Sequence, residues 1–109
     1  MSTIYNEIIT EDSNLKLSFL EEDDISYRLL IKHNCKISFE GLQKNKLQRM
    51  TIILQQYSDG NHDIEFDSII KWKDKQPFVD TRGSYITIVE IMFDGTSQFY
   101  GRLIYDGSR

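Results

Sequence analysis

The sequence predicts a mainly β fold, an antiparallel β-sandwich of the jelly-roll kind built from hairpins. Its 109 residues include no alanine but fifteen isoleucines and twelve phenylalanines and tyrosines. Alanine is the best helix former, whereas β-branched and aromatic side chains fit a pleated sheet. Several segments alternate apolar with polar residues and are separated by glycine, asparagine and aspartate, which favour turns. A chain of this length has room for one core.

Acidic residues gather at the start of the chain. Residues 1–24 carry seven acids and one base, whereas residues 25–50 carry six bases and one acid. We expect residues 1–24 to be an N-terminal segment that attaches the protein to a partner or supplies its first strands. Residues 25–109 are expected to form the β-sandwich domain. The net charge of −4 argues against a nucleic-acid partner, and no apolar run approaches the roughly 18 residues of a membrane span.

The clearest strand pattern runs from Ile25 to Phe39, where every odd position except His33 is apolar. Alternation of this kind indicates a sheet with one buried face. A single strand of this length would span about 50 Å at about 3.3 Å per residue, which is too long for a small domain. We therefore expect a hairpin with a three-residue loop at residues 33–35, which keeps odd positions opposite odd positions.

Two structures are compatible with residues 45–57. One face of a helix would carry the apolar residues Leu47, Met50, Ile53, Leu54 and Tyr57. This gives an α+β fold with one helix as the alternative. The β-branched run at residues 51–53 favours a strand instead. We expect that strand to form a hairpin with residues 63–72, with Leu54 opposite Phe66 and Met50 opposite Ile70.

The last predicted hairpin joins residues 85–93 to residues 99–105. A four-residue loop, Asp94–Ser97, would place Met92 opposite Phe99 and Ile88 opposite Leu103. The first strand is apolar on both faces, so we expect it to be central and to lie between two layers. Glu90 would then lie opposite Gly101. No internal repeat is evident in the chain.

The order of these features resembles the small β-domains of bacteriophage tail-fibre, head-fibre and capsid-decoration proteins. The resemblance covers about Asn34 to Tyr105 and rests on residues 39–42, Asp59-Gly60, Lys71-Trp72, Pro77, Gly83, residues 93–96 and Tyr100-Gly101. Within it, the residues that we assign to a structural motif are Trp72, Pro77, Gly83, Asp94, Gly95, Tyr100 and Gly101. The resemblance implies a virion structural protein that forms a homo-oligomer, with a trimer favoured, attaches to other virion proteins and contacts a host-surface glycan.

Chemically active arrangements are missing from the sequence, so we expect no enzyme, cofactor or metal site. His33 and Cys35 lie two residues apart, but no orienting group or oxyanion site accompanies them. Residues 59–63 resemble the opening of a calcium loop, yet the sixth and twelfth positions are Ile64 and Ile70 where glycine and glutamate are required. The single cysteine excludes an internal disulfide.

The residues proposed for an interface are Glu90, Tyr57 and Phe78. An unpaired Glu90 among apolar neighbours would be costly to bury, so it either pairs with Arg102 or Arg28 at a sheet margin or lies between subunits. The aromatic rings of Tyr57, Phe78 and Tyr100 either contact a glycan or pack in the core or in an interface. A second reading of the chain is a small acidic inhibitor, an immunity or anti-defence protein that binds a partner enzyme.

Overall fold

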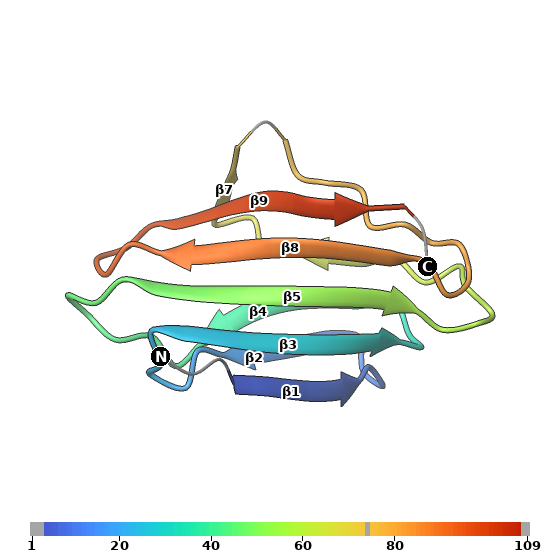
Figure 1. Cartoon of the computed structure of the whole chain (residues 1–109), viewed down its shortest axis with the longest axis horizontal. Coiled ribbons are helices and arrows are strands. Elements are labelled where there is room, and N and C mark those ends of the chain that lie inside the picture. The colour runs from blue at the N-terminus through green and yellow to red at the C-terminus, as the bar shows by residue number, and fades with distance from the viewer. Residues whose placement is uncertain (1–3, 74, 108–109) are drawn as a thin grey trace.

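The computed structural model describes residues 4–73 and 75–107, which form nine strands in two sheets and no helix (Figure 1). The larger sheet has the order β1-β3-β5-β8-β9-β7 and the smaller one β2-β4-β6. The bounds of the larger sheet's strands are β1 Ile4–Ile9, β3 Asp24–Ile31, β5 Gln48–Gln56, β8 Ile86–Phe93, β9 Phe99–Asp106 and β7 Ile70–Trp72. Those of the smaller sheet are β2 Asn14–Ser18, β4 Cys35–Glu40 and β6 Ile64–Phe66.

The first six strands alternate between the two sheets. In the larger sheet β1, β3 and β5 pair in parallel, and in the smaller one β2, β4 and β6 also pair in parallel. Each coil of the chain therefore contributes one strand to each sheet, which is the arrangement of a β-solenoid. The mainly β prediction is confirmed, but the jelly-roll sandwich of hairpins is wrong. The helix alternative is also wrong, because residues 48–56 form a strand.

The predicted hairpin at residues 25–39 is a corner between the two sheets. At His33 and Asn34 the chain leaves β3 and enters β4 in the smaller sheet. This corner stacks on the next coil, since the Asp63 N–H donates to Asn34 Oδ1 at 2.8 Å and the Cys35 N–H donates to the Asp63 carbonyl at 2.9 Å. The alternation of apolar residues identified the buried face correctly. However, two strands in different sheets can both turn this face toward the core, so the pattern does not require them to form a hairpin.

The second predicted hairpin fails for the same reason. Leu54 pairs with Leu29 of β3 and Thr87 of β8, while Phe66 pairs with Ile37 of β4. The part of the predicted return strand that contains Phe66 thus lies in the smaller sheet. Ile70 lies in β7 of the larger sheet, but it pairs with Phe99 and not with Met50. Leu54 and Phe66 are both buried in the core between the sheets, which is why their pattern is compatible with a shared face.

The β8–β9 hairpin is present and closes the larger sheet, with β8 antiparallel to β5. Its register differs by one residue from the prediction, because Phe93 pairs with Phe99 and Glu90 with Arg102. The loop spans residues 94–98. The Asp94 N–H donates to the Gln98 carbonyl, and Asp94 Oδ1 accepts the N–H groups of residues 96, 97 and 98 at 2.8–3.1 Å. This side chain closes a longer turn than the predicted one.

The backbone donors around Asp94 lower the pKa of its carboxyl group below the ordinary value, with the Thr96 N–H as the main cause. The ionised form therefore adds stability at neutral pH, and this contribution is lost as the pH falls through the lowered pKa, below pH 4. We expect Asp94→Asn to lower the melting temperature at pH 7 and to have little effect at about pH 2. Melting curves of both proteins across this range check the prediction, and a constant difference between them would contradict it.

Aromatic rings join the coils to the hairpin in the core. Phe99 has ring centroids 5.1 Å from Phe93, 5.9 Å from Phe39 and 6.4 Å from Phe19. These partners come from β8, β4 and the turn after β2, so one cluster connects both sheets. Phe66 of the smaller sheet lies edge-on to Trp72, with centroids 5.1 Å apart.

Candidate interface on the outer face of the six-stranded sheet

The outer face of the larger sheet is formed by alternate residues of each strand. In β8 the inward residues Thr87, Val89, Ile91 and Phe93 are buried, whereas the residues between them are partly exposed. The outward residues are Ile86, Ile88, Glu90 and Met92. The smaller sheet covers only the inner face, so β8 is central within its sheet but lies under one layer only (Figure 1). The expectation that it lies between two layers is wrong within the described chain.

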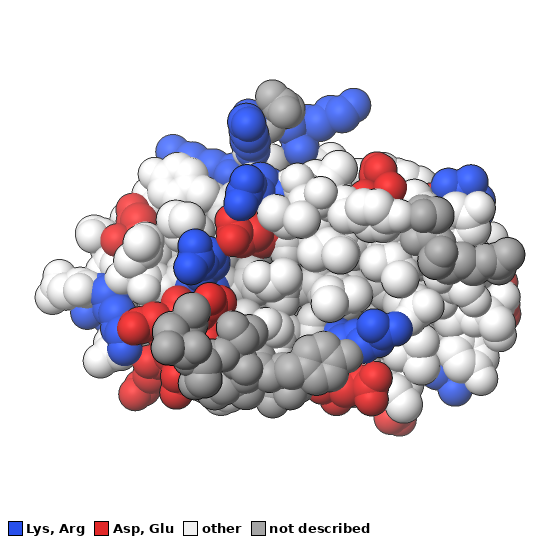
Figure 2. Space-filling view, in the orientation of Figure 1, with Lys and Arg blue, Asp and Glu red and all other residues white. Residues whose placement is uncertain are grey.

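Apolar side chains occupy the middle of this outer face. Ile53 pairs with Ile88, and Ile88 pairs with Tyr105, so three strands present a row of large side chains. Beside this row, Leu30, Gln55 and Ile86 align across β3, β5 and β8. We call the apolar members the apolar field: Leu30, Ile53, Ile86, Ile88 and Tyr105. Figure 2 shows a broad uncharged area over these strands, with the charged groups gathered toward one end and the margins.

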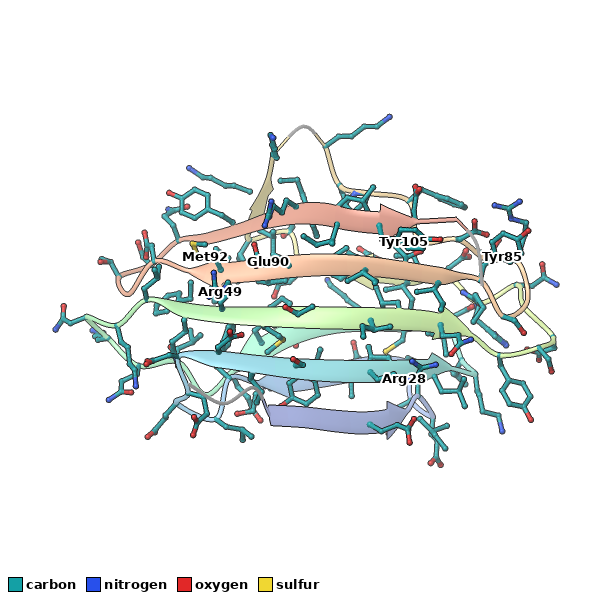
Figure 3. The ribbon with its side chains drawn as sticks, viewed as in Figure 1. Arg28, Arg49, Tyr85, Glu90, Met92 and Tyr105 are labelled. Carbon is teal, nitrogen blue, oxygen red and sulfur yellow. The ribbon has the colours of Figure 1, made fainter. Side chains whose placement is uncertain are left out.

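Alternating charges cross the same face at the end where β8 finishes. Arg49 lies 3.6 Å from Asp24 and 3.9 Å from Glu90, and Arg102 Nε donates to Glu90 Oε1 at 2.9 Å. The Glu90 side chain is only 15% exposed, so two guanidinium groups offset the cost of its burial. Figure 3 shows Arg49, Glu90 and Met92 grouped on β5 and β8. The one-residue shift in register brings Arg102, and not Gly101, opposite Glu90.

A groove of about 520 Å³ opens beside these charges, across β5, β8, β9 and β7. Its lining combines four basic side chains with Glu90 and apolar groups. We call it the basic groove, and its residues are Arg49, Lys71, Trp72, Lys73, Glu90, Met92, Tyr100, Gly101 and Arg102. Its volume lies within the range of about 300–1,000 Å³ that is usual for ligand sites.

Three residues of the predicted structural motif meet at the basic groove. Tyr100 is 45% exposed on its lining. A Cβ atom on Gly101 would lie 2.6 Å from the Trp72 ring, so only glycine permits this close approach. Gly95 and Gly83 pack against other turns: a Cβ atom would lie 2.9 Å from the Lys46 nitrogen and 2.3 Å from the Ser58 carbonyl oxygen, respectively.

The other two predicted interface residues are part of neither the apolar field nor the lining of the basic groove. Tyr57 follows β5, and its ring lies 4.4 Å from Lys32 Nζ. Phe78 is 73% exposed in the loop between β7 and β8, next to Pro77. The structure therefore does not bring Glu90, Tyr57 and Phe78 together in one site.

The residues considered for catalysis form no active arrangement in the described part of the chain. His33 is exposed, and its Nδ1 lies 2.8 Å from the Asn34 carbonyl oxygen. Burial raises the pKa of the Cys35 thiol, which disfavours the reactive thiolate. Residues 4–73 and 75–107 contain no group of three potential metal ligands. No helix among them is long and apolar enough to span a membrane.

The apolar field was missed as a site, although its signals are in the sequence. Leu30 is the one apolar exception among the polar even positions of residues 25–39, and residues 85–93 are apolar on both faces. Both observations mark residues that the structure places on the outer face. The basic groove had no local signal, because its bases come from three separate parts of the chain, which are β5, β9 and β7 with the residue after it.

A small all-β scaffold with an apolar sheet face that the rest of its described chain leaves uncovered is typical of proteins that assemble with other proteins. Sequence comparison gives the family: a family model described as "Putative phage tail fibre C-terminal domain" matches residues 22–98. The chain belongs to this family. It is therefore a structural protein of the bacteriophage virion, and the predicted resemblance is confirmed. No curated protein sequence and no solved structure matches the chain significantly.

Proposed function

We propose that this domain acts in the tail fibre by self-association, with the apolar field as the contact between copies. A homotrimer is the expected state. The observation that carries the proposal is the row of Ile53, Ile88 and Tyr105 on a face that no other described part of the chain covers. The function proposed is mechanical and adhesive, without catalysis, and no observation favours the inhibitor alternative.

A second copy of the chain suits the apolar field better than an unrelated partner does. The field has no charged member, while the charges beside it alternate in sign across Asp24, Arg49, Glu90 and Arg102. A face with balanced charges can meet its own copy without net repulsion. Arg28 borders the field. It forms an ion pair with Glu7 and donates a hydrogen bond to Gln55 Oε1. An apolar centre with a polar rim is the usual anatomy of an interface.

We expect Ile88→Glu to dissociate the oligomer, raising its dissociation constant at least about 100-fold, since a carboxylate would be buried without a partner at the centre of the contact. Light scattering across a concentration series measures the mass, and circular dichroism reports the fold. Ile53→Lys provides a second variant in the same row. The matched control is Ile69→Glu, an exposed residue in the turn before β7.

The proposal is supported if the wild type and the Ile69→Glu variant are trimers while the Ile88→Glu and Ile53→Lys variants are folded monomers. Persistence of the oligomer in both field variants would move the contact to another face. A wild type that remains monomeric at high concentration would contradict self-association altogether.

A further inference from the structure

We propose that the basic groove binds an acidic polysaccharide, a sugar polymer whose units carry carboxylate or phosphate groups. The inference deepens the proposed adhesive function by naming a site and a ligand class. The groove lies at the end of the sheet where β8 finishes and at the β7 margin, so it is at the rim of the proposed contact between copies.

The charge of the groove is opposite to that of the whole chain. Four bases and one acid line it, which gives +3 locally in a chain of net charge −4. Figure 2 shows basic side chains following one another from the β7 margin toward β5, interrupted by a single acidic group. A concentration of one sign in a concave site attracts ligands of the other sign.

The bases of the groove have free donors. Lys71 and Lys73 are exposed, and neither has an ion pair within the part of the chain that the structure describes. Arg102 uses its Nε for Glu90, which leaves the terminal nitrogens of a 58% exposed side chain for a ligand. Guanidinium groups bind carboxylate and phosphate in a planar, two-point geometry. Ion pairs with Glu90 hold Arg49 and Arg102 next to each other at the groove.

The apolar lining favours a sugar as the carrier of the negative charge. Met92 and Tyr100 line the groove between the bases, whereas the Trp72 ring lies behind the groove against Phe66. Tyrosine combines an apolar ring with a polar group, so it suits ligands that have both kinds of surface. The C–H face of a pyranose ring is such a surface, and its acidic substituent would reach the surrounding bases. An acidic polypeptide matches the charges but offers no comparable flat apolar face.

The test uses the full-length protein and follows the fluorescence of Trp72, which is the only tryptophan and lies directly behind the groove. Polygalacturonate serves as the acidic polysaccharide, dextran as the neutral one and polyglutamate as the acidic polypeptide. We expect polygalacturonate to change the fluorescence with saturation, and added salt to weaken its binding. Dextran should have no effect, and polyglutamate should bind at least tenfold more weakly. Calorimetry checks each titration independently.

The double variant Lys71→Gln/Lys73→Gln should weaken polygalacturonate binding at least tenfold. Its matched control is Lys16→Gln/Lys36→Gln, which removes two exposed lysines from β2 and β4 of the other sheet. If both double variants lose the same affinity for polygalacturonate, the binding reflects general attraction by surface charge, and the proposed site is wrong. Binding of polyglutamate as tight as that of polygalacturonate would assign the groove to an acidic protein segment. Absence of binding by both measurements would also reject the proposal.

The two proposals fail separately. Light scattering on the lysine variants should give the mass of the wild type, because Lys71 and Lys73 lie outside the apolar field. A monomeric wild type that binds polygalacturonate would contradict self-association and leave the groove intact. A trimer that binds no acidic polysaccharide would contradict the proposed ligand of the basic groove and leave self-association intact.

Discussion

Replacing Phe99 with alanine should lower the free energy of unfolding by about 3–5 kcal/mol, the usual cost of deleting a buried phenylalanine ring. Phe99 is 5% exposed, and its ring contacts Phe19, Phe39 and Phe93. These neighbours belong to the first coil, the second coil and the closing hairpin, so collapse around the cavity would have to move all three. Denaturant unfolding followed by circular dichroism measures the change.

The matched control for this variant is Phe78→Ala. Phe78 is 73% exposed, so the same deletion should change stability by no more than about 0.5 kcal/mol. Both variants are compared with the wild type at one protein concentration, because the stability of an oligomer depends on it. A cost below about 1 kcal/mol for Phe99→Ala would mean that the aromatic cluster does not hold the coils to the hairpin.

The strands could be predicted from the sequence, but most of their partners could not. Alternation at residues 25–39 identifies the buried side chains correctly, since Ile25, Tyr27, Leu29, Ile31, Cys35 and Ile37 are all buried. The period of two specifies which face a residue occupies and says nothing about the neighbouring strand. A hairpin and a solenoid corner both satisfy it, and short-range pairing led to the wrong choice.

The solenoid also has no fixed sequence period. Ile25 pairs with Ile4 on one side and with Met50 on the other, at separations of 21 and 25 residues. In the smaller sheet Lys36 pairs with Asn14, while Cys35 pairs with Ile64, so those separations are 22 and 29 residues. Corners of different length therefore hide the repetition of the coils. Only the pairing in three dimensions makes it visible.

The site shows the same division between local and distant information. The outward residues of β8, including Glu90, could be assigned to one face from their spacing alone. The partner of Glu90 depended on the length of one turn, which Asp94 extends by one residue. Lys71 reaches the basic groove because β7 pairs with the far side of β9. No local pattern in the sequence predicts that parallel pairing.

Gln48 at the start of β5 is a further position where a single substitution should be costly. Its side chain is fully buried, Oε1 accepts the Gln43 N–H at 2.8 Å, and Nε2 donates to the Glu22 carbonyl at 3.1 Å. The amide group thus links two corners of the solenoid to a central strand. Gln56 does the same at the other end of β5, where it binds the backbone of His62 through both of its amide atoms.

We expect Gln48→Leu to lower the free energy of unfolding by about 2–4 kcal/mol. Leucine retains much of the apolar volume but leaves a backbone donor and a backbone acceptor without partners, and each costs about 1–3 kcal/mol when buried. Gln76→Leu is the matched control, because Gln76 is exposed in the loop after β7. Denaturant unfolding gives the cost, and hydrogen exchange should show faster exchange at the Gln43 amide. A stable Gln48→Leu protein with an unchanged Gln43 amide would mean that the corners are held by the backbone alone.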